Sequence, residues 1–341
     1  MLATAIECQN PLIFNFGDSN SDTGGYAASY GVFTGYPAGR KFFHRTADRF
    51  SDGRIILDFY CDSVKAEYMS SYLESLTPNF KTGVNFAVGG ATVLYNSNFF
   101  YLKTQVHEFQ RFHTRSLILH SEGIKGMFGE DDFRNAVYLI DIGQNDITDA
   151  FKNHSQLEVL EMIPNFIAGI NLAIRTMYDV GGRKFWVHNT GPAGCLPLKL
   201  ATHKVGDPQA EFDKAGCLKS LNELAQEFNS QLHKLCEDLR AQLPNTTVVY
   251  VDMYTIKYDL ISNSPLYGFQ NPLMACCGGG GPPYNANIMC GKPGFNVCAE
   301  DTNYISWDGV HYTDNANSVF AARVATTNYS TPPVKLESFW C

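Results

Sequence analysis

Short apolar runs alternate with longer amphipathic stretches along the chain. The runs are rich in Val, Ile, Leu and Phe, as in strands that are buried on both faces of a sheet. Polar or glycine-containing turns bound most of them, which is typical of strand ends. The pattern predicts five strands, at residues 12–16, 83–87, 137–142, 184–188 and 247–252.

Three of the stretches between these runs carry apolar residues at intervals of three and four positions, which is the periodicity of an amphipathic helix. They predict helices over 55–76, 157–180 and 212–243. Strands that are separated by long helices form parallel crossover units. We therefore expect an α/β fold, a three-layer α/β/α sandwich of the flavodoxin-like kind with a central parallel sheet, whose ligands bind at the carboxyl ends of the strands.

The whole chain, residues 1–341, is predicted to form one domain. Its length would allow two domains, but no repeat, low-complexity tract or linker divides the sequence. The Gly- and Pro-rich stretch 276–283 lies between cysteines and is interpreted as a loop. It belongs to a cysteine-rich region around 276–298, which we expect to be held by disulfides.

The two ends of the chain are expected to be a mature N-terminus and a C-terminal surface tail. Residues 1–9 are too short for a signal peptide and lack its charged start, so we interpret them as a mature N-terminus. The segment from about 328 contains Pro332 and Pro333 and is expected to be a surface tail, fastened by Cys341. Between the ends, no run of about 18 apolar residues occurs, so no membrane-spanning helix is expected.

Composition and charge narrow the classes of function. Hydrophobic residues make up 45% of the chain and charged residues 18%, which is ample material for a globular core. The net charge is −8, and Lys and Arg form no cluster, which argues against binding to nucleic acid or to an anionic membrane. We therefore expect no nucleic-acid partner and no stable membrane insertion, and we favour a monomer.

Ten cysteines are many for a cytosolic enzyme of this size. A secreted, disulfide-bonded chain explains them best. Cys195 and Cys217 flank a loop that precedes a long predicted helix, and we expect them to pair. Three glycosylation sequons agree with a secretory route, with acceptors at Asn153, Asn245 and Asn328.

A zinc site is the alternative interpretation of the cysteines late in the chain. Cys276 and Cys277 with Cys290 and Cys298 would supply four thiols. Adjacent cysteines lack the two-residue gap that lets both thiolates face one metal, so disulfides are favoured. The remaining cysteines cannot be paired from spacing; they are Cys8, Cys61, Cys236 and Cys341.

Candidate chemistry lies near both ends of the chain. Ser19 follows a predicted strand in Phe-Gly-Asp-Ser-Asn-Ser, and Asp308 precedes His311 by three positions. A serine hydroxyl is a weak nucleophile, so it needs a base such as His311 and a third group, here Asp308, to orient that base. An isolated Gly-Asp-Ser is more often a helix cap or Asx-turn, and an isolated Asp-x-x-His is more often a solvated loop pair. The interpretation therefore depends on the segments between them.

Two such segments supply hydrogen-bond donors at strand ends. Residues 83–92 form an apolar run that ends in Gly89 and Gly90, where glycine permits a positive φ and presents a bare N–H. Residues 136–146 end in a Gly-x-Asn-Asp turn that carries Asn145. Acyl transfer needs donors aimed at the developing oxyanion. The Ser19 N–H, the Gly90 N–H and the Asn145 side chain would provide three.

In this order, Ser19, Gly90, Asn145 and His311 resemble the four blocks of the SGNH hydrolases. The chain is most similar to the plant GDSL-type esterase/lipases, and within them to the branch with early nodulin-like and fucosidase-named members, because Asn20 stands where the family name expects Leu. The resemblance implies a Ser19 nucleophile, a triad completed by Asp308 and His311, and oxyanion donors at Gly90 and Asn145. Gly89 could replace Gly90, which is preferred because Asn85 lies five positions before it.

The predicted function is a secreted carboxylic-ester hydrolase, extracellular, in the cell wall or vacuolar, that needs no metal and no organic cofactor. Small acyl groups such as acetyl, on plant polysaccharides or specialised metabolites, are the favoured substrates, so the partner is a small-molecule or glycan ester. One alternative is an acyltransferase that moves an acyl group such as hydroxycinnamoyl to an alcohol. A non-catalytic binding protein and a glycosidase are less favoured, since a full serine site is present and a glycosidase needs two carboxylates at a defined separation.

The loop after the candidate nucleophile is rich in arginine and aromatic residues. Two interpretations are open: the loop lines an acyl or sugar pocket, or it forms a structural cluster of ion pairs and rings. The second is favoured, because such ion pairs need no function. The residues concerned are Arg40, Phe42, Phe43, Arg49, Asp52 and Arg54.

Overall fold

The computed structural model describes residues 11–203 and 211–340 and has a six-stranded sheet at its centre. The strand order is β2-β1-β3-β4-β5-β8. The first five of these strands are parallel, and β8 pairs with β5 in the antiparallel direction. Their bounds are β1 (Ile13–Gly17), β2 (Gly83–Asn85), β3 (Val137–Asp141), β4 (Lys184–His188), β5 (Thr247–Val251) and β8 (Ser330–Thr331).

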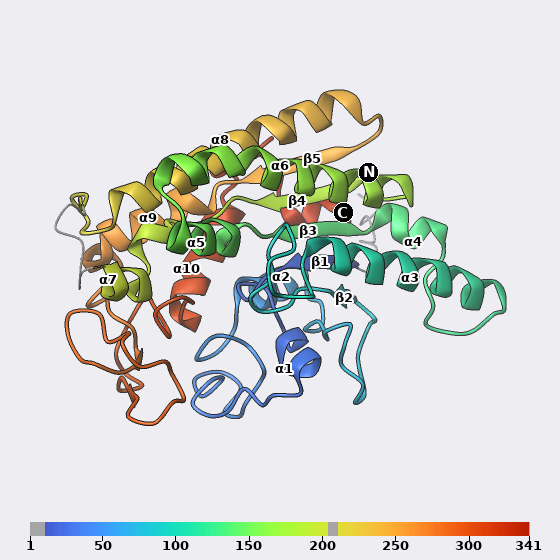
Figure 1. Cartoon of the computed structure of the whole chain (residues 1–341). Coiled ribbons are helices and arrows are strands. Elements are labelled where there is room, and N and C mark those ends of the chain that lie inside the picture. The colour runs from blue at the N-terminus through green and yellow to red at the C-terminus, as the bar shows by residue number, and fades with distance from the viewer. Residues whose placement is uncertain (1–10, 204–210, 341) are drawn as a thin grey trace, which may run out of the picture.

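Successive side chains of each strand are buried on opposite faces of the sheet. In β1, Phe14 and Phe16 join one apolar cluster and Ile13 joins the other; in β4, Phe185 and Trp186 divide in the same way. Helices α3, α6 and α8 cover the first face, and α2, α9 and α10 cover the second, so the predicted three-layer α/β/α sandwich is confirmed (Figure 1). These helices are α2 (Ile56–Ser63), α3 (Leu102–Ser121), α6 (Gln156–Asp179), α8 (Lys219–Gln242), α9 (Met253–Ser262) and α10 (Asp314–Ala325).

Shorter elements connect the main ones. Four are helices: α1 (Gly25–Tyr30), α4 (Glu130–Asn135), α5 (Gln144–Asn153) and α7 (Pro197–His203). Three are 3₁₀ turns: η1 (Ala193–Cys195), η2 (Ser264–Tyr267) and η3 (Leu336–Phe339). A small antiparallel sheet pairs β6 (Cys277–Gly278) with β7 (Asn296–Val297).

Two of the predicted helices are too long at one end. The helix predicted over 55–76 ends at Ser63, because Lys65 takes a left-handed φ of 56° and Ser71 then forms a parallel bridge to Asn85 beside β2. The helix predicted over 212–243 begins only at Lys219. The residues before it form a turn and are tied back by a disulfide at Cys217. The third predicted helix, 157–180, matches α6 to within one residue at each end.

The expected surface tail is wrong where the segment joins the sheet and the core. Ser330 and Thr331 form β8 at the edge of the main sheet. Leu336 and Trp340 are buried in the apolar cluster on the second face, at 5% and 7% exposure. Cys341, which was expected to fasten the tail, lies outside the described residues, as do Cys8 and the predicted N-terminus 1–9.

Disulfides account for the cysteines that were considered as zinc ligands. Cys276 is bonded to Cys298 and Cys277 to Cys290, and the predicted Cys195–Cys217 bond is present. Cys61 and Cys236 are free and buried in the core. Within residues 11–203 and 211–340, no group of three or more His, Cys, Asp or Glu side chains is placed to hold a metal ion.

The sequon asparagines are all exposed at Asn153, Asn245 and Asn328, so glycosylation at each remains a prediction. Helix α6 has the length and the mean hydropathy, 1.4, of a membrane-spanning helix. One such helix is weak evidence of membrane insertion. Its inner face packs among the core residues that cover the sheet, as a core helix does.

Glu108 on α3 offers a test of core electrostatics. Its Oε2 is buried without a hydrogen-bond partner, and burial raises the pKa of the carboxyl to about 7. Since the folded state holds the proton more tightly than the unfolded chain, stability falls as pH rises from about 4.5 to about 7. We expect Glu108→Gln to raise the thermal midpoint by about 2 °C at pH 8 and to leave it unchanged near pH 4. Differential scanning fluorimetry at both pH values, with the exposed Glu161→Gln as control, measures this; an equal shift at both would contradict it.

Candidate active site

Ser19 lies just past the carboxyl end of β1, in a turn that is held by Gly17 and Gln105. A Cβ on Gly17 would lie 2.3 Å from the Asp141 carbonyl oxygen and 2.8 Å from Ser21 Oγ, so only glycine fits there. The buried Gln105 side chain accepts from the Gly17 N–H at 2.9 Å and donates to the Gly17 carbonyl at 2.8 Å. These contacts fix the strand end from which the serine projects.

His311 and Asp308 meet Ser19 in one hydrogen-bonded chain. His311 Nε2 lies 2.6 Å from Ser19 Oγ, and His311 Nδ1 lies 2.6 Å from Asp308 Oδ2. Asp308 Oδ1 also accepts from the backbone N–H groups of Val310 and His311, at 3.0 and 2.8 Å, which closes a tight turn around the carboxylate. The structure thus brings together three residues that are 292 positions apart at their extremes.

The carboxyl of Asp308 is held in its charged form. Burial alone would raise its pKa, but the charge of His311 and the hydrogen bonds from the His311 ring and from the backbone N–H groups of His311 and Val310 lower it below the usual value. An ionised carboxylate accepts the proton on Nδ1, which leaves Nε2 as an acceptor for the Ser19 hydroxyl.

Gly90 lies in the loop after β2, where its φ of 78° suits glycine. The neighbouring Gly89 N–H already donates to Asp22 Oδ2, at 2.7 Å. Between these two glycines, the geometry therefore favours Gly90 as the one whose N–H is available. Asp22 also accepts from the N–H groups of Gly24 and Tyr26, so one carboxylate ties the loop to the start of α1.

Asn145 lies in the first turn of α5, just past the carboxyl end of β3. Its Nδ2 donates to the Ala91 carbonyl at 3.0 Å and lies 3.5 Å from Asp18 Oδ2, so the amide is oriented by the loop that carries Gly90. The next residue, Asp146, accepts from the Val93 N–H through both carboxylate oxygens. The loop after β2, which carries Gly90, and the start of α5, which carries Asn145, are thus bound to each other.

The sequence matches the family described as GDSL-like Lipase/Acylhydrolase over residues 13–324. The chain belongs to this family. A GDSL esterase/lipase of Arabidopsis thaliana is 51% identical over 347 residues, which cover 99% of this chain and 92% of the relative. The GDSL esterase/lipase ENOD8 of Medicago truncatula is 40% identical, over 97% of this chain and 90% of its own.

These relatives bear out the predicted resemblance, including its early nodulin-like branch, and the protein is a carboxylic-ester hydrolase. Its disulfides and its plant relatives fit a protein of the secretory pathway. Among solved structures, the lipase Lip_vut3 from a goat rumen metagenome has a TM-score of 0.42 at 10% identity, with 94% of this chain and 98% of that chain covered. The strand order and the helical layers on both faces of the sheet define the fold.

In this GDSL-like hydrolase, an aromatic ring stacks on the histidine. The Phe50 ring lies 4.7 Å from the His311 ring, centre to centre, at an interplanar angle of 30°. The His311 carbonyl accepts from the Trp307 N–H at 2.8 Å, which fixes the backbone beneath the ring. Sequence reasoning missed Phe50, because no spacing relates a phenylalanine in the loop after α1 to a histidine near the C-terminus.

A buried group of charges lies behind Ser19 and was also missed from the sequence. Burial raises the pKa of Asp18 to about 7, the charge of Asp141 acts in the same direction, and hydrogen bonds from Asn20 oppose it. Burial would raise the pKa of Asp141 too, but the hydrogen bond and charge of His188 and the charge of Lys257 lower it. Lys257, itself 5% exposed, has Nζ 4.6 Å from the centre of the Tyr312 ring. The cation compensates carboxylate charge close to the serine.

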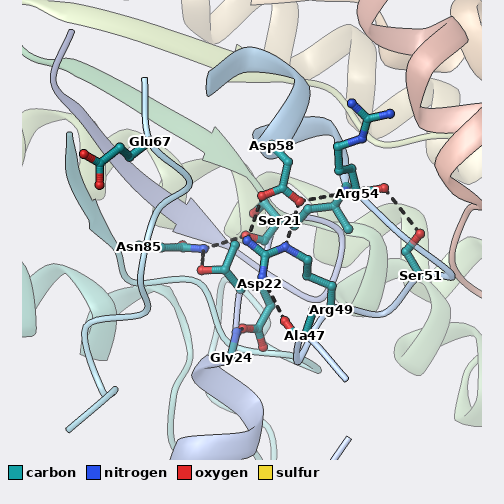
Figure 2. A network of polar contacts seen from close by, with 12 residues as sticks. Ser21, Asp22, Gly24, Ala47, Arg49, Ser51, Arg54, Asp58, Glu67 and Asn85 are labelled. Atoms are coloured by element: carbon teal, nitrogen blue, oxygen red, sulfur yellow. Dashed lines mark hydrogen bonds and ion pairs between the residues drawn. The ribbon is translucent and has the colours of Figure 1, made fainter. Parts of the chain in front are cut away.

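The arginine-rich loop turns out to be a structural cluster around the site. Arg49 forms a buried, two-pronged ion pair with Asp58, both contacts at 2.7 Å, and donates to the Ala47 carbonyl. Arg54 pairs with Asp314 and lies over Phe42, at 4.0 Å from the ring centre. Figure 2 shows Arg49 between Asp58 and Ala47, and it also shows Asn85, which donates to the Ser21 carbonyl. These contacts anchor the loop on which Phe50 lies.

Proposed function

We propose that this protein is a secreted serine esterase that uses a Ser19–His311–Asp308 triad. The observation that carries the proposal is the hydrogen-bonded chain from Asp308 through His311 to Ser19, with 2.6 Å at each contact. The oxyanion donors are the Ser19 N–H, the Gly90 N–H and the Asn145 amide. We place the enzyme in the extracellular space, the cell wall or the vacuole, with small acyl esters, such as acetates, of plant polysaccharides or specialised metabolites as its substrates.

The reaction proceeds in two steps through an acyl-enzyme. His311 Nε2 takes the Ser19 proton as Oγ attacks the ester carbonyl, and the three donors hold the oxyanion. Collapse of the tetrahedral intermediate breaks the bond to the alcohol oxygen, which receives the proton from His311. Water then repeats the sequence: His311 removes its proton, the hydroxyl attacks the acyl group, and the acid leaves as Ser19 regains its proton.

An acyltransferase uses the same first step. The two activities differ in whether an alcohol or water attacks the acyl-enzyme. A pocket of about 480 Å³ lies beside His311 and offers room for an acceptor alcohol. This pocket is the observation that supports the acyltransferase as an alternative. A binding protein without catalysis is disfavoured, since binding alone has no need of the hydrogen-bonded chain.

Mass spectrometry of the intact protein tests the proposal. After brief mixing with a fluorophosphonate or a slow aryl ester, wild type is expected to gain the mass of one phosphonyl or acyl group, and Ser19→Ala none. Labelling of both proteins, or of neither, would overturn the Ser19 mechanism. Adding an alcohol such as benzyl alcohol to the acylated enzyme then separates the activities: a transferase yields the new ester, and a hydrolase yields the free acid.

Replacement of the Asn145 amide tests its proposed role as an oxyanion donor. Asn145→Ala is expected to lower kcat by about a hundredfold to a thousandfold with little change in KM, because the donor acts mainly on the oxyanion. Steady-state hydrolysis of an aryl acetate measures the effect. Asn165→Ala, an exposed change on α6, is the matched control and should leave kcat unchanged. A rise in KM with unchanged kcat would instead assign Asn145 to substrate binding.

A further inference from the structure

The pocket beside His311 is formed by two loops from distant parts of the chain. One is the loop after α1, which contributes residues 32–38, and the other is the disulfide-bonded loop, which contributes 286 and 289–292. Both loops lie below the sheet in the view of Figure 1. The rest of the lining includes Arg49, Phe50 and Trp307 together with Asp308 and His311. A volume of about 480 Å³ is within the usual range for small-molecule sites.

The chemistry of ester cleavage identifies which half of the substrate this pocket faces. In the proposed mechanism, His311 returns its proton to the alcohol oxygen as that oxygen leaves, so the alcohol must lie on the histidine side of the ester carbonyl. The oxyanion lies on the side of Gly90 and Asn145. The described residues that line the pocket include His311 and Asp308 but neither of those donors. The pocket is therefore on the side of the alcohol.

Large apolar side chains gather at the rim of this pocket with much of their surface in water. Phe33 is 80% exposed, Tyr36 68% and Met289 65%. Exposed apolar patches of this kind mark binding sites, since a ligand that covers them removes apolar surface from water. Aromatic rings also favour stacking with another ring.

Of the charged side chains in the lining, Lys292 is exposed, and Arg49 and Asp308 are held by neighbouring groups. The Arg49 guanidinium is held by Asp58 and the Ala47 carbonyl, and the Asp308 carboxylate by His311. A ligand with many hydroxyl groups would remove less of this apolar surface from water than an apolar ligand of the same size, so its binding gains less free energy. From this lining we propose that the pocket binds the alcohol half of the ester and that this alcohol is apolar, with an aromatic ring. The inference rests on the proposed serine mechanism and selects metabolite esters over polysaccharides.

Covalent and polar contacts hold both walls in place before a ligand binds. The Cys277–Cys290 bond fixes the loop next to Met289. Arg40 joins the walls, because its Nη2 donates to the Cys298 carbonyl at 2.9 Å and its guanidinium lies 5.6 Å from the centre of the Trp307 ring. A preformed pocket loses little entropy on binding and so discriminates well between alcohols.

Acetate esters that share the acyl group and differ in the alcohol test the proposal. Ethyl acetate, 2-phenylethyl acetate and an acetylated glucose are compared by kcat/KM. Wild type is expected to prefer 2-phenylethyl acetate over ethyl acetate by about tenfold or more. Phe33→Ser and Met289→Ser are each expected to reduce that preference several-fold, because each slows hydrolysis of the phenylethyl ester more than that of ethyl acetate. Leu266→Ser, a change at a residue 82% exposed in η2, is the matched control and should alter neither.

Three results would overturn the proposal. They are equal kcat/KM for the ethyl and phenylethyl esters, a preference for the acetylated sugar, and variants that slow all acetates equally. A separate comparison keeps ethanol as the alcohol and varies the acyl group. If Phe33→Ser changes kcat/KM according to the acyl group, the pocket binds the acyl half of the ester, which contradicts the proposal. Labelling of Ser19 by fluorophosphonate is independent of these results, so an enzyme that is labelled but shows no alcohol preference contradicts this inference and leaves the proposed mechanism standing.

Discussion

Ester hydrolysis by the Ser19→Ala variant is expected to fall by about 10⁶-fold in kcat, close to the uncatalysed rate. The side-chain oxygen is both the attacking atom and the only polar group that alanine lacks, so no acyl-enzyme can form. The hydroxyl is hydrogen-bonded to His311, and its loss leaves the buried turn around Gly17 and Gln105 intact. We therefore expect an unchanged thermal midpoint beside the lost activity.

Steady-state turnover of an aryl acetate, with fluorimetry on the same samples, measures both quantities. Ser29→Ala is the matched control, since Ser29 Oγ donates within α1 to the Tyr26 carbonyl, away from His311. Its activity should equal that of wild type. Residual Ser19→Ala activity above about one hundredth of wild type would show that another group can attack the ester, and the assignment of the nucleophile would fail.

The Asp308→Asn variant is expected to lose about 10³- to 10⁴-fold in kcat. The amide retains an oxygen in place of Oδ1, which accepts the backbone N–H groups of Val310 and His311, so the turn can persist. The NH₂ group in place of Oδ2 donates toward His311 Nδ1 and favours the tautomer with its proton on Nε2. Such a ring cannot accept the Ser19 proton.

Circular dichroism and the thermal midpoint distinguish this cause from unfolding. A tautomer defect lowers kcat while the near-UV circular dichroism and the thermal midpoint stay close to wild type. Asp301→Asn, at an exposed position in the same part of the chain, controls for the change of charge. A loss of less than tenfold in Asp308→Asn would mean that the short contact to His311 contributes little to turnover.

The parallel strands were predictable because each lies in a mainly apolar segment that is buried on both faces. Their ends came within two residues of the predicted ends, and β4 matched fully. β8 was not predictable, since Ser330 and Thr331 carry no apolar pattern and become a strand only by pairing with β5. Helix α3 was also missed, because Gln105, His113 and Ser116 on its buried side interrupt the apolar periodicity. Where local pattern and tertiary contact disagree, tertiary contact decides the structure.

The candidate site, too, contains residues that the sequence could place and residues that it could not. The motif residues Ser19, Asn145 and His311 could be placed at strand ends and loops from the sequence, and the structure brings them close together, while their catalytic roles stay predictions. The Phe50 ring and the Lys257 charge could not be inferred, because each acts through a contact between distant segments. The choice between Gly89 and Gly90 likewise needed the Asp22 contact, which no sequence spacing reveals.

The final segment of the chain shields a sheet edge. Ser330 and Thr331 pair with Val251 and Tyr250 of β5, whose backbone groups would otherwise form an open edge, and Trp340 is buried in the apolar cluster on the second face. An unprotected edge strand is a template for pairing with other chains and promotes aggregation. A protein shortened at about 328, where the sequence suggested a surface tail, would expose β5 in this way. The proline-containing segment therefore protects this sheet edge from intermolecular β-sheet growth.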